Sequence, residues 1–329
     1  MTVLPSRALP ATPWSATRAD ESYGVTAQPD WRNIDWREHL HQMEIAGRRI
    51  NYVEMGSGDG PPIVFVHGLG GRWQNWLENI PRAALERRAL ALDLPGFGAS
   101  DMPRDGITIP GYGRCVEEFC ERLELGEVVL VGNSMGGFVS AEVAIQRPQR
   151  VDRLVLVSAA GISITNLHRR PVETWGRAAA AFGAYGAARV RAMIVRPRLR
   201  HIVLGYVVRH PTRLRTEICW ELMSGAGSPG FRTALDALLE YDFRDRLGDI
   251  RCPTLIVWGS DDMLVPLKDA SEFERLIPDA RKVIFEDTGH VAMIERPETF
   301  NHCLMEFVTG QAALPGETEE AETPSPTAA

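Results

Sequence analysis

The residue pattern best suited to chemistry is a serine held between glycines at the end of an apolar run. The run Val128 to Val131 leads directly into GNSMGG at residues 132–137, and a helical pattern follows. GxSxG spacing at such a strand-to-helix junction places the serine in a strained turn, where larger flanking side chains would collide with neighbouring backbone. The motif predicts a nucleophile at Ser134, although a glycine-rich turn with a capping serine has the same letters.

A serine hydroxyl is a poor nucleophile unless a histidine base, oriented by a carboxylate, removes its proton. Two carboxylates, Asp261 and Asp262, follow the apolar run Thr254 to Trp258, and His290 follows the next such run. A lone Asp or His is usually structural, but chance rarely produces the order Ser, Asp, His at successive strand ends. We expect Ser134, Asp262 and His290 to form a catalytic triad, with Asp261 as the alternative acid.

Acyl transfer also needs hydrogen-bond donors for the oxyanion that develops on the substrate. The amide of Met135 directly follows the nucleophile at a helix start, where unpaired amides and the helix dipole favour negative charge. The amide of Leu69 is the second candidate, because it lies in the glycine-rich turn HGLGG at residues 67–71. His67 in the same turn is expected to bond loop backbone rather than to take part in catalysis.

Elements that alternate between apolar runs and amphipathic stretches must position these residues. Such alternation is typical of βα units around a mostly parallel sheet. The predicted strands are Gln42 to Ile45, Ile50 to Glu54, Ile63 to Val66, Ala89 to Asp93, Val128 to Gly132, Leu154 to Ser158, Thr254 to Trp258 and Lys282 to Phe285. The predicted flanking helices are Tyr112 to Leu123, Met135 to Gln146, Lys268 to Leu276 and Pro297 to Val308.

The interval 161–248 interrupts this alternation. It has no clear strand, is rich in arginine, and includes helical stretches such as Thr174 to Ala188 and Phe231 to Leu239. Because a structureless loop of this length is uncommon in a compact domain, we expect an inserted helical cap. The core is then expected at 41–160 and 249–310. Residues 1–40 are interpreted as an N-terminal extension, and residues 311–329 as a disordered acidic tail.

Composition narrows the classes of function. The chain has 329 residues, 44% of them hydrophobic, and a net charge of −7; an acidic average disfavours nucleic acid as a partner. With no long apolar segment and no secretory signal pattern, we expect a cytoplasmic protein without stable membrane insertion. The five cysteines lack the spacing of a zinc site and are expected to be buried, reduced thiols.

These segments together resemble the α/β-hydrolase superfamily, from about Met43 to Phe307. The motifs that carry the resemblance are the turn at 67–71, DLPGFGAS at 93–100, the GxSxG elbow, GxxDxxxP at 259–266 and the Gly289-His290 pair. The resemblance implies an α/β fold with an eight-stranded sheet flanked by helices and a helical cap at about 161–248. It also implies that the acid is Asp262, the Asp of GxxDxxxP.

A serine at the elbow, rather than the aspartate of haloalkane dehalogenases and epoxide hydrolases of this fold, favours ester hydrolysis through an acyl-enzyme. We therefore expect a carboxylesterase or lipase-like enzyme acting on a small, apolar ester or acyl substrate, with no cofactor and no metal. The elbow also resembles that of meta-cleavage product hydrolases, which cleave carbon–carbon bonds, but Val291 after His290 departs from that group's usual tryptophan. A non-catalytic binding protein is the alternative of another class. The substrate's chain length and the oligomeric state are left open.

Overall fold

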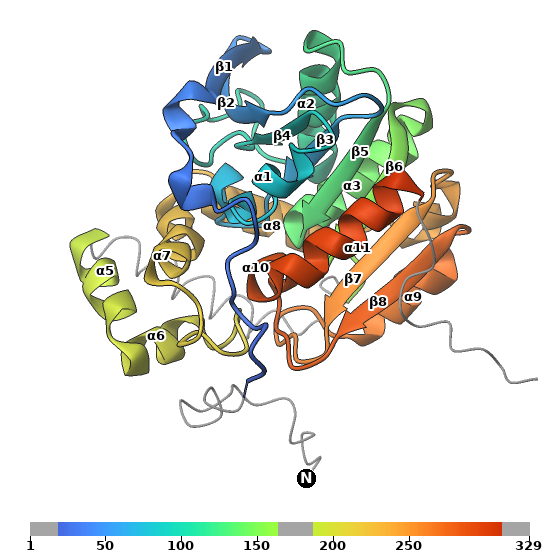
Figure 1. The fold of residues 1–329 in the computed structure, drawn as a ribbon. Coiled ribbons are helices and arrows are strands. Elements are labelled where there is room, and N and C mark those ends of the chain that lie inside the picture. Colours follow the sequence, from blue (N-terminus) through green and yellow to red (C-terminus); the bar gives the residue numbers. More distant parts are fainter. Residues whose placement is uncertain (1–18, 164–186, 311–329) are drawn as a thin grey trace, which may run out of the picture.

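The computed structural model describes residues 19–163 and 187–310, and one eight-stranded sheet forms its centre (Figure 1). The strand order is β1-β2-β4-β3-β5-β6-β7-β8. The β1–β2 and β2–β4 pairs are antiparallel, whereas the remaining pairs are parallel. The strands are β1 Leu40–Ile45, β2 Arg48–Met55, β3 Ile63–Val66, β4 Ala89–Leu92, β5 Val128–Asn133, β6 Val151–Val157, β7 Thr254–Gly259 and β8 Ala280–Phe285.

The central strands are buried on both faces because their residues alternate between two hydrophobic cores. In β5, for example, Val128 and Leu130 belong to one core, and Val129 and Val131 belong to the other. Side chains that point to both faces of a sheet need cover on both sides, so such strands are apolar throughout. This requirement explains the continuous apolar runs in the sequence.

Helices supply that cover. Buried residues of α2, α3 and α9 join the first core, and those of α1, α10 and α11 join the second; α10 and α11 are drawn in orange and red in Figure 1. Their bounds are α1 Ile80–Ala83, α2 Ile109–Arg122, α3 Met135–Gln146, α9 Lys268–Leu276, α10 Ala292–Glu295 and α11 Pro297–Thr309.

Between β6 and β7, the described residues form four further helices. These are α5 Ala187–Val195, α6 Pro197–Leu204, α7 Thr216–Ser224 and α8 Phe231–Glu240. Figure 1 shows α5, α6 and α7 to one side of the sheet. Most of the helix expected at Thr174 to Ala188 falls outside the described residues, as do residues 1–18 and the tail 311–329.

Short 3-10 helices complete the described elements, and most of them lie in connections. They are η3 Trp31–Asn33, η4 Trp36–Glu38, η5 Trp73–Trp76, η6 Pro148–Arg150, η7 Gly225–Gly227 and η8 Arg244–Asp249. Within the described ranges, no helix is both long and apolar enough to cross a membrane.

The predicted strands and flanking helices are all present, and the differences are confined to their ends. Helix α2 begins at Ile109 rather than Tyr112, because Thr108 caps it by accepting a hydrogen bond from the amide of Gly111. Strands β6 and β8 begin earlier than predicted. The added residues include Asp152 and Arg281, whose polar side chains break the apolar pattern. The pairing nevertheless extends to Val151 and Ala280, with one irregularity of register between β5 and β6.

Candidate functional site

Ser134 lies at the junction of β5 and α3 in a conformation that few residues adopt. Its φ is 55° and its ψ is −119°, which places it among the residues with left-handed φ. The space around the turn requires glycine on both sides. A Cβ on Gly132 would lie 2.3 Å from the Gly136 carbonyl oxygen, and one on Gly136 would lie 2.1 Å from the Val66 carbonyl oxygen. The sequence therefore folds into this turn only with small flanking residues.

His290 and Asp262 are paired at the carboxyl edge of the sheet, after β8 and β7 respectively. The distance from His290 Nδ1 to Asp262 Oδ2 is 2.8 Å, and the Asp262 side chain is fully buried. The other carboxylate oxygen of Asp262 accepts hydrogen bonds from the amides of Leu264 and Val265, at 2.8 and 2.9 Å. These amides fix the carboxylate, so that it offers Oδ2 to the imidazole.

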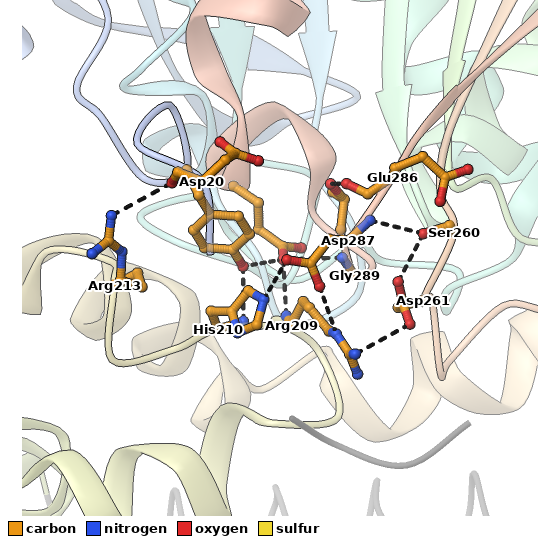
Figure 2. Close-up of polar contacts among 12 residues, drawn as sticks. Asp20, Arg209, His210, Arg213, Ser260, Asp261, Glu286, Asp287 and Gly289 are labelled. Carbon is orange, nitrogen blue, oxygen red and sulfur yellow. Dashed lines mark hydrogen bonds and ion pairs between the residues drawn. The ribbon is translucent and has the colours of Figure 1, made fainter. Parts of the chain in front are cut away.

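Asp261, the alternative acid, has other partners. Its carboxylate accepts a hydrogen bond from Ser260 Oγ at 2.7 Å and forms an ion pair with Arg209 at 3.5 Å. Figure 2 shows Asp261 between Ser260 and Arg209. Of the two adjacent carboxylates, the structure brings Asp262 to His290.

Asn133 connects the turn that carries Ser134 to the loop that carries His290, residues 289–291, called here the histidine loop. Sequence reasoning missed this contact. Its Nδ2 donates to the carbonyl oxygens of Val157, at 3.0 Å, and His290, at 3.3 Å. The residue lies inside the elbow motif, but its letter alone does not reveal a partner 157 positions away.

The loop at residues 67–71 lies against Ser134. A Cβ on Gly68 would be 3.1 Å from the Cβ of Ser134, so a larger residue here would crowd the serine. His67 bonds loop backbone as expected: its Nδ1 donates to the Gly68 carbonyl at 2.8 Å, and its Nε2 accepts from the Leu94 amide at 3.0 Å. Burial lowers the pKa of His67, which favours the neutral ring that these two bonds require.

The two amides expected to hold an oxyanion, those of Leu69 and Met135, are placed in this loop and at the first position of α3. Within the described part of the chain, neither amide donates a hydrogen bond to a protein group. Both N–H groups can therefore donate a hydrogen bond to a ligand oxygen.

Helix α7, which belongs to the interval 161–248, contacts the chain at residues 70–72, at the end of the loop 67–71. Arg72 Nη2 donates to Glu221 Oε2 at 2.6 Å and to Ser224 Oγ. Gly225, directly after α7, lies so close to the loop that a Cβ there would be 1.9 Å from the Gly70 carbonyl oxygen.

Several arginines of the basic interval are bonded within the protein. Arg200 is buried and donates to the carbonyls of Ile194 and Leu214. Arg215 donates to Thr26 Oγ1 at 2.7 Å. These two guanidinium groups stabilise the helices and their contact with the N-terminal segment.

One known architecture has this order of strands, with a strained serine after β5 and a His–Asp pair after β8 and β7. The pattern of the alpha/beta hydrolase fold family matches residues 61–297. The chain belongs to the α/β-hydrolase family.

Relatives within this family differ in their chemistry. A 2-hydroxy-6-oxo-2,4-heptadienoate hydrolase of Pseudomonas putida is 30% identical over 290 residues, which cover 83% of this chain and 97% of that protein. The dihydrolipoyllysine-residue acetyltransferase component of an acetoin cleaving system, also from Pseudomonas putida, is 30% identical over 270 residues. The match covers 80% of this chain and 68% of that protein. Among solved structures, a bacterial membrane phospholipase A is 25% identical with a TM-score of 0.66, and the match covers 82% of this chain and 86% of that chain.

Proposed function

We propose that this α/β-hydrolase cleaves carboxylic esters through an acyl-enzyme on Ser134. The observation that carries the proposal is the buried hydrogen bond between His290 Nδ1 and Asp262 Oδ2. A carboxylate at Nδ1 fixes the neutral tautomer that leaves Nε2 able to accept a proton, and it stabilises the imidazolium that forms afterwards.

In the proposed reaction these groups act in turn. His290 removes the hydroxyl proton of Ser134 as its oxygen attacks the substrate carbonyl carbon. The carbonyl oxygen becomes an oxyanion that accepts hydrogen bonds from the amides of Leu69 and Met135. The alcohol leaves with the proton from His290, and a water molecule activated by the same histidine releases the acid.

An ester is the preferred substrate class because Ser134 is the nucleophile and Val291, not tryptophan, follows His290. The match to a phospholipase A agrees with this choice. Carbon–carbon bond hydrolysis is the second candidate. Two observations support it. One is the GNSMGG elbow, and the other is the match to the 2-hydroxy-6-oxo-2,4-heptadienoate hydrolase, which covers 97% of that relative.

Side-by-side turnover of p-nitrophenyl esters of increasing acyl length and of a 2-hydroxy-6-oxo-dienoate separates the two candidates. We expect ester hydrolysis to exceed dienoate cleavage in the wild type and to vanish in Ser134→Ala. That variant should fold, because the hydroxyl makes no capping hydrogen bond to α3. Faster dienoate cleavage would favour the second candidate. Near-normal esterase activity in Ser134→Ala would contradict the assignment of the nucleophile, and inactivity on both substrates would favour a binding protein.

A further inference from the structure

A buried carboxylate lies directly beneath the loop that carries His290. Glu295, in α10, is fully buried. Its Oε2 accepts a hydrogen bond from the amide of Gly289 at 3.0 Å, and its Oε1 accepts one from the amide of Val291 at 3.2 Å. The two amides that flank His290 are therefore bound to one side chain.

The amide of His290 itself has a different partner. It donates to the carbonyl oxygen of Val207 at 2.9 Å, in the connection between α6 and α7. Three consecutive amides of the histidine loop thus have fixed partners. The Cβ of a residue at 289 would lie 2.9 Å from both the Arg209 nitrogen and the Val207 oxygen, so Gly289 allows this connection to pack closely.

Glu295 also receives hydrogen bonds from two distant segments. Its Oε2 accepts from the amide of Arg209 at 2.8 Å and from the hydroxyl of Tyr23, which in turn accepts from the amide of His210 at 2.9 Å. Figure 2 shows Arg209, His210 and Gly289 close to one another. The N-terminal segment, the α6–α7 connection and the histidine loop meet at one carboxylate.

Charge and burial make this a demanding arrangement. Burial raises the pKa of Glu295 and that of Tyr23, since neither ionised form is easily held without water. Four donors directed at the carboxylate offset that cost. Removing one of these donors to Glu295 should therefore make the histidine loop more mobile without leaving a cavity in the hydrophobic core.

We propose that Tyr23 and Glu295 are positioning residues for His290, and that the N-terminal segment is in this way part of the catalytic apparatus. The inference rests on the proposed function, in which His290 is the base. Neither side chain needs to touch substrate. Their effect is on the orientation of the imidazole, and a displacement of about 1 Å at a catalytic group can cost roughly 10²-fold in rate.

The chain offers a matched pair of variants. Tyr23→Phe removes one donor to Glu295, whereas Trp31→Phe removes one donor from the same N-terminal segment to another buried carboxylate, Glu78. Trp31 Nε1 lies 2.9 Å from Glu78 Oε1. The amides of residues 289–291 bond to Glu295 and Val207, not to Glu78. A general loss of attachment of the segment should affect both variants alike.

Two measurements test the inference in the full-length protein. Tyr23→Phe should speed the hydrogen exchange of the Gly289, His290 and Val291 amides and lower kcat for the preferred substrate about tenfold, with little change in KM. Trp31→Phe should change neither. Glu295→Gln, which keeps one oxygen acceptor, should lose less activity than Glu295→Ala; if the Glu295 variants fail to fold, Tyr23→Phe still decides the matter.

Normal kcat in Tyr23→Phe, or equal losses in Tyr23→Phe and Trp31→Phe, would overturn the inference. Failure of the proposed function has a different signature. In that case His290→Ala or Ser134→Ala would remain active, whereas a failed positioning role leaves those two variants inactive and Tyr23→Phe normal.

Discussion

His290 Nδ1 lies 2.8 Å from Asp262 Oδ2, although two aspartates stand side by side in the sequence before it. The distinction arises in the loop after β7. Asp262 points its carboxylate inward, where two amides bind the other oxygen, whereas Asp261 meets Arg209 and Ser260. Neighbouring residues of one type therefore have different contacts.

Replacing Asp262 with Asn should lower kcat by about 10⁴-fold, because the amide cannot hold the imidazole in the tautomer that accepts the serine proton. The control is Asp261→Asn, which alters the contact with Arg209 and should change kcat by less than about tenfold. Steady-state kinetics on the preferred substrate measures both. Equal losses in the two variants would contradict the assignment of the acid.

Much of this site could be predicted from the sequence, because each motif is local. The elbow motif at 132–137 indicates a strand, a turn and a helix within a few residues. Asp262 and His290 each follow an apolar run. Parallel strands bring such ends to a common edge. Tyr23, Glu295 and Arg209 could not be found in this way. Their partners lie in other segments of the chain, and an isolated Tyr or Glu carries no local signal of burial.

Asn133→Ala should lower kcat about tenfold, since the loss of a buried donor leaves the carbonyl of His290 without this partner and weakens the connection between elbow and histidine loop. Because Nδ2 also donates to Val157, stability should fall by about 1–3 kcal/mol. Kinetics and thermal unfolding of the purified variant measure the two effects. Unchanged kcat together with reduced stability would show that Asn133 only supports the fold.

Gly136→Ala should destabilise the protein by about 3 kcal/mol or more, or prevent folding, because the added Cβ would lie 2.1 Å from the Val66 carbonyl oxygen and 2.6 Å from that of His67. Backbone atoms cannot move aside as a flexible side chain can. Gly248→Ala is the control, since its nearest neighbour would be 3.9 Å away. Chemical denaturation compares the two variants, and a normal midpoint for Gly136→Ala would contradict the close approach of α3 to the loop after β3.

The cysteines should not act as nucleophiles in the folded protein. Cys120, Cys219, Cys252 and Cys303 are buried, and burial raises the pKa of Cys120 and Cys219 to about 12 and that of Cys252 and Cys303 to about 11. The partly buried Cys115 has a pKa of about 12 for the same reason. A raised thiol pKa means less thiolate, the reactive form, at any pH below it.

At pH 8 the thiolate fraction of a thiol with a pKa near 12 is on the order of 10⁻⁴. A disulfide reagent such as DTNB should therefore react very slowly with the native protein and rapidly with five thiols in denaturant. A serine-directed fluorophosphonate, by contrast, should abolish activity in proportion to the Ser134 labelled. Rapid inactivation by the thiol reagent without unfolding would show that a cysteine lies at the site and would weaken the case for Ser134.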